Sequence, residues 1–166
     1  DCTINFESSM MIIDTYKPRW YTEEVEALGD LVRRFTAEEI TPNQERYFAE
    51  GATDRALWRK AGDLGIILPD IDEAYGGSGG TFAHEAVVAH ELCLAGDTSW
   101  RPGKQIHVIA AHYISRYGTP DQKRKYLPKL ASGEMIAGMG MTEPGGGTDL
   151  QNLRTRAIRQ GDSYVV

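Results

Sequence analysis

Hydrophobic residues recur at steps of three and four near the start of the chain, which is the spacing of one face of an α-helix. The members of this stripe are Val25, Leu28, Val32 and Phe35. Thr22 is a suitable N-cap, and the two glutamates that follow it suit the positive end of the helix dipole. The pattern therefore predicts an amphipathic helix that begins after Thr22 and is kinked or ended by Pro42.

Further helical patterns cover residues 54–63, 83–94, 106–117 and 119–130. The first is expected to bury Leu57, Trp58 and Ala61, and the second is alanine-rich and apolar enough to be packed well inside the protein. The expected buried stripe of the third consists of Ile106, Ile109, Ala110, Tyr113, Ile114 and Tyr117. The last segment begins with Thr119 as a cap, Pro120 at the first helical position and Gln122 completing a capping box.

The pattern changes after residue 133. Residues 135–141 form a short apolar run with small residues, which predicts a buried strand, and residues 154–159 and 163–166 predict two strands around a turn at 160–162. The expected organisation is an irregular lead-in over residues 1–20, a helical domain over 21–133 and the beginning of a β domain over 134–166. The fold class is therefore mainly α, with a helical bundle followed by the first strands of a β domain.

Composition narrows the classes of function. The chain has 166 residues, 41% of them hydrophobic and 25% charged, so it can form an ordinary packed core. The net charge of −6 argues against nucleic acid as the main partner, because phosphate binding needs a concentrated basic surface. No apolar run reaches the roughly 20 residues of a membrane-spanning helix. The two cysteines make no disulfide framework, which favours a reducing cytoplasm, and Cys93 is expected to be a small core residue.

The loop over residues 142–149, Thr-Glu-Pro-Gly-Gly-Gly-Thr-Asp, is the strongest candidate for a binding site. Its three glycines remove every Cβ that would keep a ligand from the backbone, and successive amides can form a concave nest for anionic oxygens. Thr142 and Thr148 add a hydroxyl on either side, but no Lys or Arg lies inside the loop. The pattern therefore excludes a Gly-x-x-x-x-Gly-Lys-Ser/Thr phosphate loop. It suits a diphosphate or polar ring held by neutral hydrogen bonds, although a flexible turn has the same composition.

Other candidate sites are weaker. The glycine-rich loop at residues 76–80 has no basic partner nearby and is interpreted as a structural turn between two helices. His84 and His90 are six positions apart, and His107 and His112 are five apart. A zinc-binding pair needs two histidines four apart on one helical face, so no metal site is expected.

Residues 139–153, Met-Gly-Met-Thr-Glu-Pro-Gly-Gly-Gly-Thr-Asp-Leu-Gln-Asn-Leu, closely resemble the flavin loop of acyl-CoA dehydrogenases, which usually contains Thr-Glu-Pro-Gly-Ala-Gly-Ser-Asp. The resemblance extends back through residues 118–134, 73–79 and 57–60, and so covers nearly everything from 21 to 166 in the order of the family. Gly146 replaces the usual alanine and Thr148 the usual serine, and both changes keep the chemistry. Met139 stands at a position that is often aromatic or small in the family.

The resemblance implies FAD as the cofactor and a β-barrel domain that begins with the predicted strands. Met139 and Met141 would set backbone against the flavin ring, and Thr142 would donate a hydrogen bond to the pyrimidine edge. Such a donor stabilises the negative charge that the ring gains on reduction. Gly147 and Thr148 would face the cofactor diphosphate, with Thr148 also near the pantetheine or diphosphate of an acyl-CoA substrate.

The activity that the resemblance implies is α,β-dehydrogenation of an acyl-CoA thioester. In the family the catalytic base comes from a C-terminal helical domain, so no catalytic residue is assigned within residues 1–166 and the chain alone is expected to be inactive. The implied partners are an acyl-CoA, an electron-transfer flavoprotein or another electron acceptor, and further copies in a homo-oligomer. Two alternatives stay open. One is an acyl-CoA oxidase or flavin monooxygenase on the same scaffold, and the other is a non-catalytic helical binding module.

Overall fold

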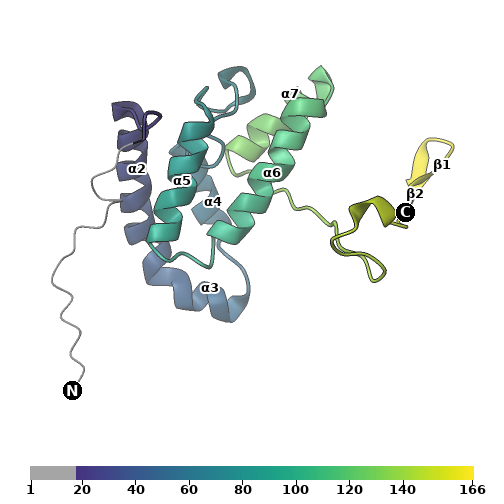
Figure 1. Ribbon diagram of the computed structural model, residues 1–166, viewed down its shortest axis with the longest axis horizontal. Helices are drawn as coiled ribbons and strands as arrows, with labels where there is room; N and C mark the ends of the chain where they lie inside the picture. Colours follow the sequence, from purple (N-terminus) through teal and green to yellow (C-terminus); the bar gives the residue numbers. More distant parts are fainter. Residues whose placement is uncertain (1–17) are drawn as a thin grey trace.

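Helices form the body of the molecule, and a thin C-terminal segment extends away from it (Figure 1). The computed structural model describes residues 18–166, so the lead-in expected over 1–20 lies almost wholly outside the described residues. The helices are Glu23–Phe35 (α2), Gln44–Glu50 (α3), Arg55–Asp63 (α4), Phe82–Leu94 (α5), Arg101–Tyr117 (α6) and Pro120–Ala131 (α7). The strands are Ile158–Gln160 (β1) and Ser163–Val165 (β2). The expected fold class is confirmed.

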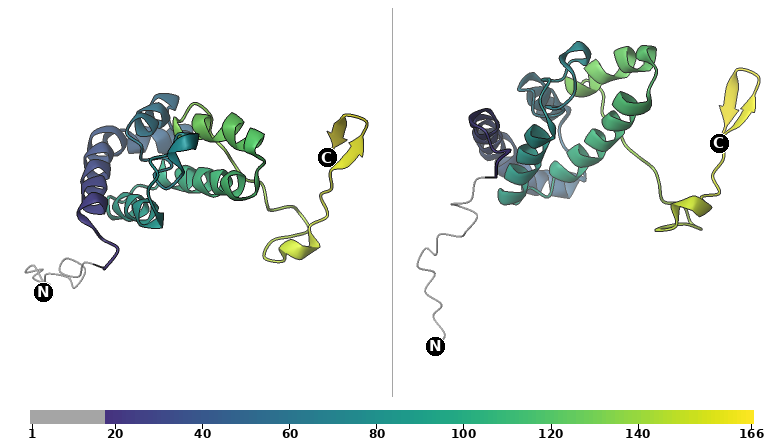
Figure 2. Two further views of the ribbon diagram at one scale, coloured as in Figure 1. Left: turned by 90° about the horizontal axis from the view of Figure 1, so that it is seen from above. Right: turned by 45° about the horizontal axis from the view of Figure 1, so that its top comes forward.

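Helix α2 packs on α5, α5 packs on α6, and α6 packs on α7. Two further views show that the far part of the C-terminal segment, with the strands β1 and β2, stays clear of this bundle in each orientation (Figure 2). In the described part of the chain, no helix combines the length and the apolar character that crossing a membrane requires.

Helix α2 follows the expected pattern. The Thr22 side chain accepts a hydrogen bond from the amide of Val25, and Val32 and Phe35 lie on the buried face. A π-helical turn, Thr36–Ile40, and a 3₁₀ turn, Thr41–Asn43, then divert the chain into α3. Pro42, which was expected to kink or end the helix, lies in the second turn, where it has no N–H to donate; α2 itself already ends at Phe35.

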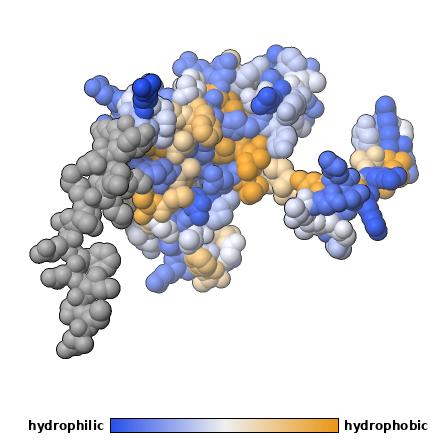
Figure 3. Space-filling model, in the orientation of Figure 1, coloured by the Kyte–Doolittle hydropathy of each residue, from blue (hydrophilic) through white to orange (hydrophobic). Residues whose placement is uncertain are grey.

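Helix α6 buries a different face from the one expected. Ile106, Ile109, Tyr113 and Tyr117 are 39%, 39%, 56% and 72% exposed, whereas Lys104, His107, Val108 and Ala111 are buried. The reason is that both polar residues find partners inside the bundle, so the face that carries them can turn inward without leaving a polar group unpaired. Figure 3 shows a hydrophobic patch on the bundle near the point where the C-terminal segment leaves it.

Helix α5 contains the partner of Lys104. The Lys104 ammonium donates to both carboxylate oxygens of Glu85, at 2.5 and 2.7 Å, and both side chains are buried. Burial raises the pKa of Glu85 and lowers the pKa of Lys104, and each shift is opposed by the charge of the other residue. This ion pair joins α5 to α6 through the interior.

The same helix gives a second correction, because Cys93 is exposed and is not a core residue. The buried face of α5 runs through Val88 and Leu92, four positions apart. One further residue turns the next side chain by about 100° around the helix, which carries Cys93 away from the core.

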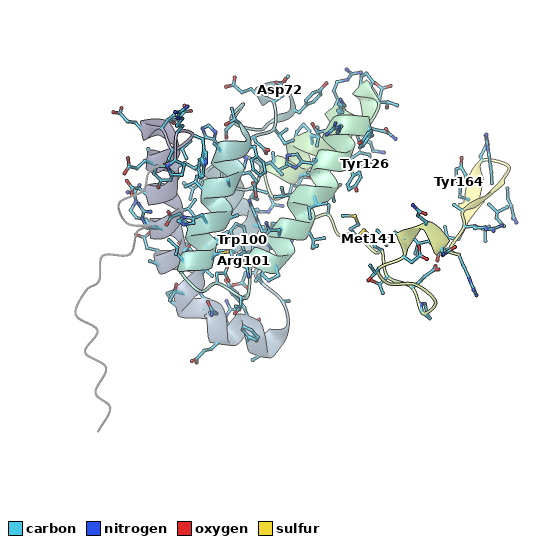
Figure 4. The ribbon with its side chains drawn as sticks, in the orientation of Figure 1. Asp72, Trp100, Arg101, Tyr126, Met141 and Tyr164 are labelled. Carbon is cyan, nitrogen blue, oxygen red and sulfur yellow. The ribbon has the colours of Figure 1, made fainter. Side chains whose placement is uncertain are left out.

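The aromatic core lies beneath α6. The rings of Trp58 and Trp100 meet edge to face with centroids 5.5 Å apart, and Phe35 meets Trp100 in the same manner at 5.8 Å. Trp100 lies at the N-terminal end of α6, deep between the helices (Figure 4). These contacts join α2, α4 and α6.

The prediction of a buried strand over residues 135–141 is wrong. This segment has no strand partner among the described residues, and Met135, Ile136 and Met141 are exposed. A strand needs a neighbour for its N–H and C=O groups, and none lies beside this one. The predicted hairpin does form: β1 pairs antiparallel with β2, with Gly161 at a φ of 62° in the turn. Its first strand is shorter than the expected 154–159.

We predict that Lys104→Met lowers the free energy of unfolding by about 3 kcal/mol, because it leaves the Glu85 carboxylate buried without its partner. The double variant Lys104→Met, Glu85→Leu should recover most of this loss, because no buried charge remains. Urea denaturation of the single and double variants measures both effects. Equal losses in the two variants would show that the ion pair itself, and not the orphaned charge, sets the stability.

Candidate functional site

The path from the bundle to the glycine loop begins at a close contact between α7 and α4. Gly133, with a φ of 69°, follows α7, and a Cβ at this position would lie 2.3 Å from the carbonyl oxygen of Trp58. On α4, a Cβ at Gly62 would lie 2.4 Å from the carbonyl oxygen of Ser132. Arg55 of α4 also donates to the carbonyl of Glu134. Two glycines thus let the backbones touch, and this contact sets where the chain leaves the bundle.

His107 provides the next attachment. Its Nδ1 accepts a hydrogen bond from the amide of Ala137 at 3.0 Å, so Nδ1 carries no proton and Nε2 donates to the carbonyl of Leu130 at 3.2 Å. The ring is fully buried, with its centroid 5.2 Å from that of Trp58. Burial lowers the pKa of His107 to about 4; the hydrogen bond to Leu130 opposes this shift and the charge of Lys104 adds to it. The imidazole is therefore neutral at physiological pH.

The first predicted site residues lie on the segment beyond Ala137. Met139 is half-buried, whereas Met141 and Thr142 are exposed. Figure 4 shows Met141 clear of the bundle, on the segment that leads to the loop. These residues are thus presented on a surface and are not packed into the core.

Glu143 closes the loop that follows. Its carboxylate accepts hydrogen bonds from the amides of Arg154 and Thr155, at 2.6 and 2.9 Å, and from the Thr155 hydroxyl at 2.6 Å. These bonds, of which the hydroxyl bond has the largest effect, hold the pKa of Glu143 below its usual range. The two ends of the loop are therefore joined through a single side chain.

The closed loop surrounds an open hollow of about 830 Å³. Gly147 and Thr148 lie in its lining, so the structure brings these two predicted residues together, but Met139, Met141 and Thr142 are not part of it. Arg154 and Arg156 also line the hollow. Sequence reasoning missed both arginines because it considered only cations inside the loop. The closure through Glu143 places the chain after the loop beside the glycines.

Four of the five glycines between residues 138 and 147 are not required by the packing or the backbone conformation of the described residues. A Cβ at Gly138, Gly140, Gly145 or Gly147 would meet no atom within 4 Å, and none of these residues has a positive φ. The loop at 76–80 is different: Gly76 has a φ of 84°, and a Cβ at Gly77 would lie 2.0 Å from the carbonyl oxygen of Ile71. The loop at 76–80 is therefore a structural turn, as expected. The segment over residues 138–147 instead leaves its backbone open to a molecule outside the described residues.

Two hydrogen-bonding partners account for His112 near the bundle surface. His112 Nδ1 lies 2.8 Å from the carbonyl oxygen of Val108, and its Nε2 lies 2.9 Å from the Asp70 carboxylate. Burial alone would lower the pKa of His112, but these two acceptors outweigh burial and raise it. Within residues 18–166, no three His, Cys, Asp or Glu side chains are grouped closely enough to hold a metal ion.

Comparison with known proteins matches residues 22–134 to the family model for the acyl-CoA dehydrogenase N-terminal domain. The long-chain specific acyl-CoA dehydrogenase of Rattus norvegicus mitochondria is 35% identical over 160 residues, which cover 96% of this chain. An acyl-CoA dehydrogenase structure from Geobacillus kaustophilus is 37% identical, with a TM-score of 0.84 over 90% of the chain. A Mycobacterium smegmatis glutaryl-CoA dehydrogenase in complex with FADH2 is 30% identical, with a TM-score of 0.78 over 86% of the chain.

These relatives are much longer than the chain. The matched part covers 37% of the Rattus norvegicus protein, 39% of the Geobacillus kaustophilus protein and 37% of the Mycobacterium smegmatis protein.

We predict that Gly133→Ala destabilises the protein at least twice as much as Gly96→Ala. Both residues have nearly the same left-handed φ, 69° and 67°, so each variant loses roughly 1 kcal/mol from backbone strain. Only at Gly133 would the new Cβ collide with backbone, because Gly96 has no neighbour within 4 Å. Chemical denaturation of the two variants measures the difference, and equal losses would contradict the close contact with α4.

We predict that Glu143→Ala opens the loop. Without the carboxylate, the amides of Arg154 and Thr155 lose their acceptor, so their hydrogen exchange should accelerate. Because the pKa of Glu143 is lowered, the wild-type closure should persist at neutral pH and weaken only as the pH falls through that lowered value. Glu134→Ala, which removes a carboxylate upstream of the loop, is the matched control and should leave these amides unchanged.

Proposed function

This chain belongs to the acyl-CoA dehydrogenase family, and on that premise we propose that it forms the helical domain and one wall of the flavin site of an FAD-dependent acyl-CoA dehydrogenase. The reaction would be α,β-dehydrogenation of an acyl-CoA thioester. In this proposal the helical domain covers residues 21–133, and the β domain that carries the flavin loop begins at residue 134.

The observation that carries the proposal is the open backbone from residue 138 to residue 147. Four glycines there lack both a positive φ and a neighbour that would exclude a side chain. Glycine costs conformational entropy, so a run of glycines without an internal role is best explained by a ligand that approaches the backbone closely. The sequence of this segment resembles the flavin loop of the family, which supports the proposal.

The residues around the hollow suit the diphosphate of FAD. Gly147 and Thr148 would offer an amide and a hydroxyl to its oxygens, and the guanidinium groups of Arg154 and Arg156 add positive charge on the same hollow. Thr148 would also lie near the pantetheine or diphosphate of the acyl-CoA.

The upstream segment suits the ring of the cofactor. Met139 and Met141 would place backbone against the flavin, and Thr142 would donate to its pyrimidine edge. The flavin, when bound, supplies the hydride acceptor. Met139, Met141 and Thr142 would bind and orient the flavin ring.

The complete reaction needs groups that we do not assign to this chain. No residue within 1–166 is proposed as the catalytic base, so the 166-residue chain by itself is expected to be inactive. We further propose an acyl-CoA as substrate, an electron-transfer flavoprotein or another acceptor for the electrons, and a homo-oligomeric enzyme in a reducing compartment such as the cytoplasm.

The absorbance spectrum of the complete gene product, purified with FAD, tests this function. Addition of a panel of acyl-CoA thioesters under anaerobic conditions should bleach the flavin band. Rapid recovery of the band in air would favour an acyl-CoA oxidase, and substrate-dependent oxygen incorporation would favour a flavin monooxygenase. A colourless protein that FAD does not reconstitute would instead indicate a non-catalytic binding module.

We predict that Thr142→Ala weakens FAD binding by about tenfold and alters the flavin absorption band, because one hydrogen bond to the ring is lost. Thr98→Ala is the matched control, since Thr98 is an exposed threonine of the bundle outside the loop. Titration of the apoprotein with FAD gives the affinity and the spectrum together. Wild-type affinity and spectrum in Thr142→Ala would refute the role proposed for this side chain.

A further inference from the structure

We propose that His107 is a positioning residue for the flavin wall: its buried imidazole fixes the direction in which residues 138–142 leave the helical bundle. This inference rests on the proposed function for its consequence at the flavin. The attachment itself is a property of the helical bundle and of the segment after α7.

The hydrogen bond between His107 and Ala137 is the last hydrogen bond that joins the segment to the bundle among the described residues. Among the described residues, no hydrogen bond involves residues 138–142, and the next one along the chain is made by Glu143 within the loop. Met139, Met141 and Thr142 all lie between these two points. Their place relative to the bundle therefore depends on the direction of the chain at Ala137.

His107 can set this direction because its own position is fixed on several sides. It projects from α6, its Nε2 donates to the carbonyl of Leu130 near the end of α7, and its ring lies against Trp58 of α4. Three helices thus hold the ring, and the ring holds the amide of Ala137. A rigid chain of this kind is what keeps binding groups within a narrow range of positions.

The two ring nitrogens of His107 make hydrogen bonds of opposite direction, and this difference makes the proposed positioning role testable. Nδ1 must accept a hydrogen bond from Ala137, whereas Nε2 must donate one to Leu130. An asparagine places its amide oxygen near the position of Nδ1, and a glutamine places its amide nitrogen near the position of Nε2. His107→Asn therefore keeps the acceptor for Ala137, His107→Gln keeps the bond to Leu130, and His107→Leu keeps neither.

The first measurement needs no flavin. Hydrogen exchange of the complete gene product without FAD, followed on a peptide that contains Ala137, reports the attachment directly. We expect at least tenfold faster exchange of this amide in His107→Gln and His107→Leu, and protection within about threefold of wild type in His107→Asn. Wild-type protection in His107→Gln, or equal losses in the Asn and Gln variants, would overturn the inference. The comparison of Asn with Gln remains decisive if His107→Leu does not fold.

The second measurement is FAD affinity, with the flavin absorption band recorded in the same titration. We expect His107→Gln to bind FAD about tenfold more weakly and His107→Asn to bind it almost as well as wild type. A role only in bundle stability would not restore the flavin spectrum in Asn while leaving it altered in Gln.

The outcomes separate the two proposals. If the wild-type protein binds FAD and both variants match it, the inference about His107 fails and the proposed function stands. If the wild-type protein binds no FAD, the proposed function fails, and with it the flavin role of His107, whatever the exchange experiment shows.

Discussion

The arrangement of the C-terminal segment, residues 134–166, depends on a contact between two stretches of backbone. Just after α7, Gly133 lies against the carbonyl of Trp58. On the α4 side of the same contact, Gly62 leaves room for the backbone of Ser132. Side chains would separate these segments, and the chain would then leave the bundle in another direction. Because the contact exists, Ala137 reaches His107, and the segment that carries Met139, Met141 and Thr142 starts from a defined place. The candidate site is thus positioned by the helical bundle even though it lies outside it.

Local chemistry made much of the fold predictable. Thr22 and Thr119 cap α2 and α7 as their sequences indicate, and the turn around Gly161 forms the expected hairpin. Each of these features is decided within a few residues by side chains that bond to nearby backbone. The face that α6 buries was not predictable in this way. Its inward side contains Lys104 and His107, whose partners come from α5, from the end of α7 and from the segment beyond it.

The candidate site likewise contains some residues that local sequence predicts and others that only tertiary packing brings together. The open glycine loop was visible in the sequence, because glycines and hydroxyls that lie close together in the chain need no distant partner. Arg154 and Arg156 reach the hollow only because Glu143 binds the amides of Arg154 and Thr155. His107 meets Ala137 across thirty positions of sequence. Pairs at such separations are set by tertiary packing, and periodicity along one helix carries no information about them.

The buried ion pair of α5 and α6 has a consequence for how this sequence can change over generations. A replacement of either Lys104 or Glu85 alone passes through a state with one charge enclosed in the core, and that state is strongly disfavoured. A lineage is therefore expected to retain both residues or to exchange both for apolar ones, with intermediates seldom surviving. The two positions, which are nineteen apart and lie on different helices, are therefore expected to change together or not at all.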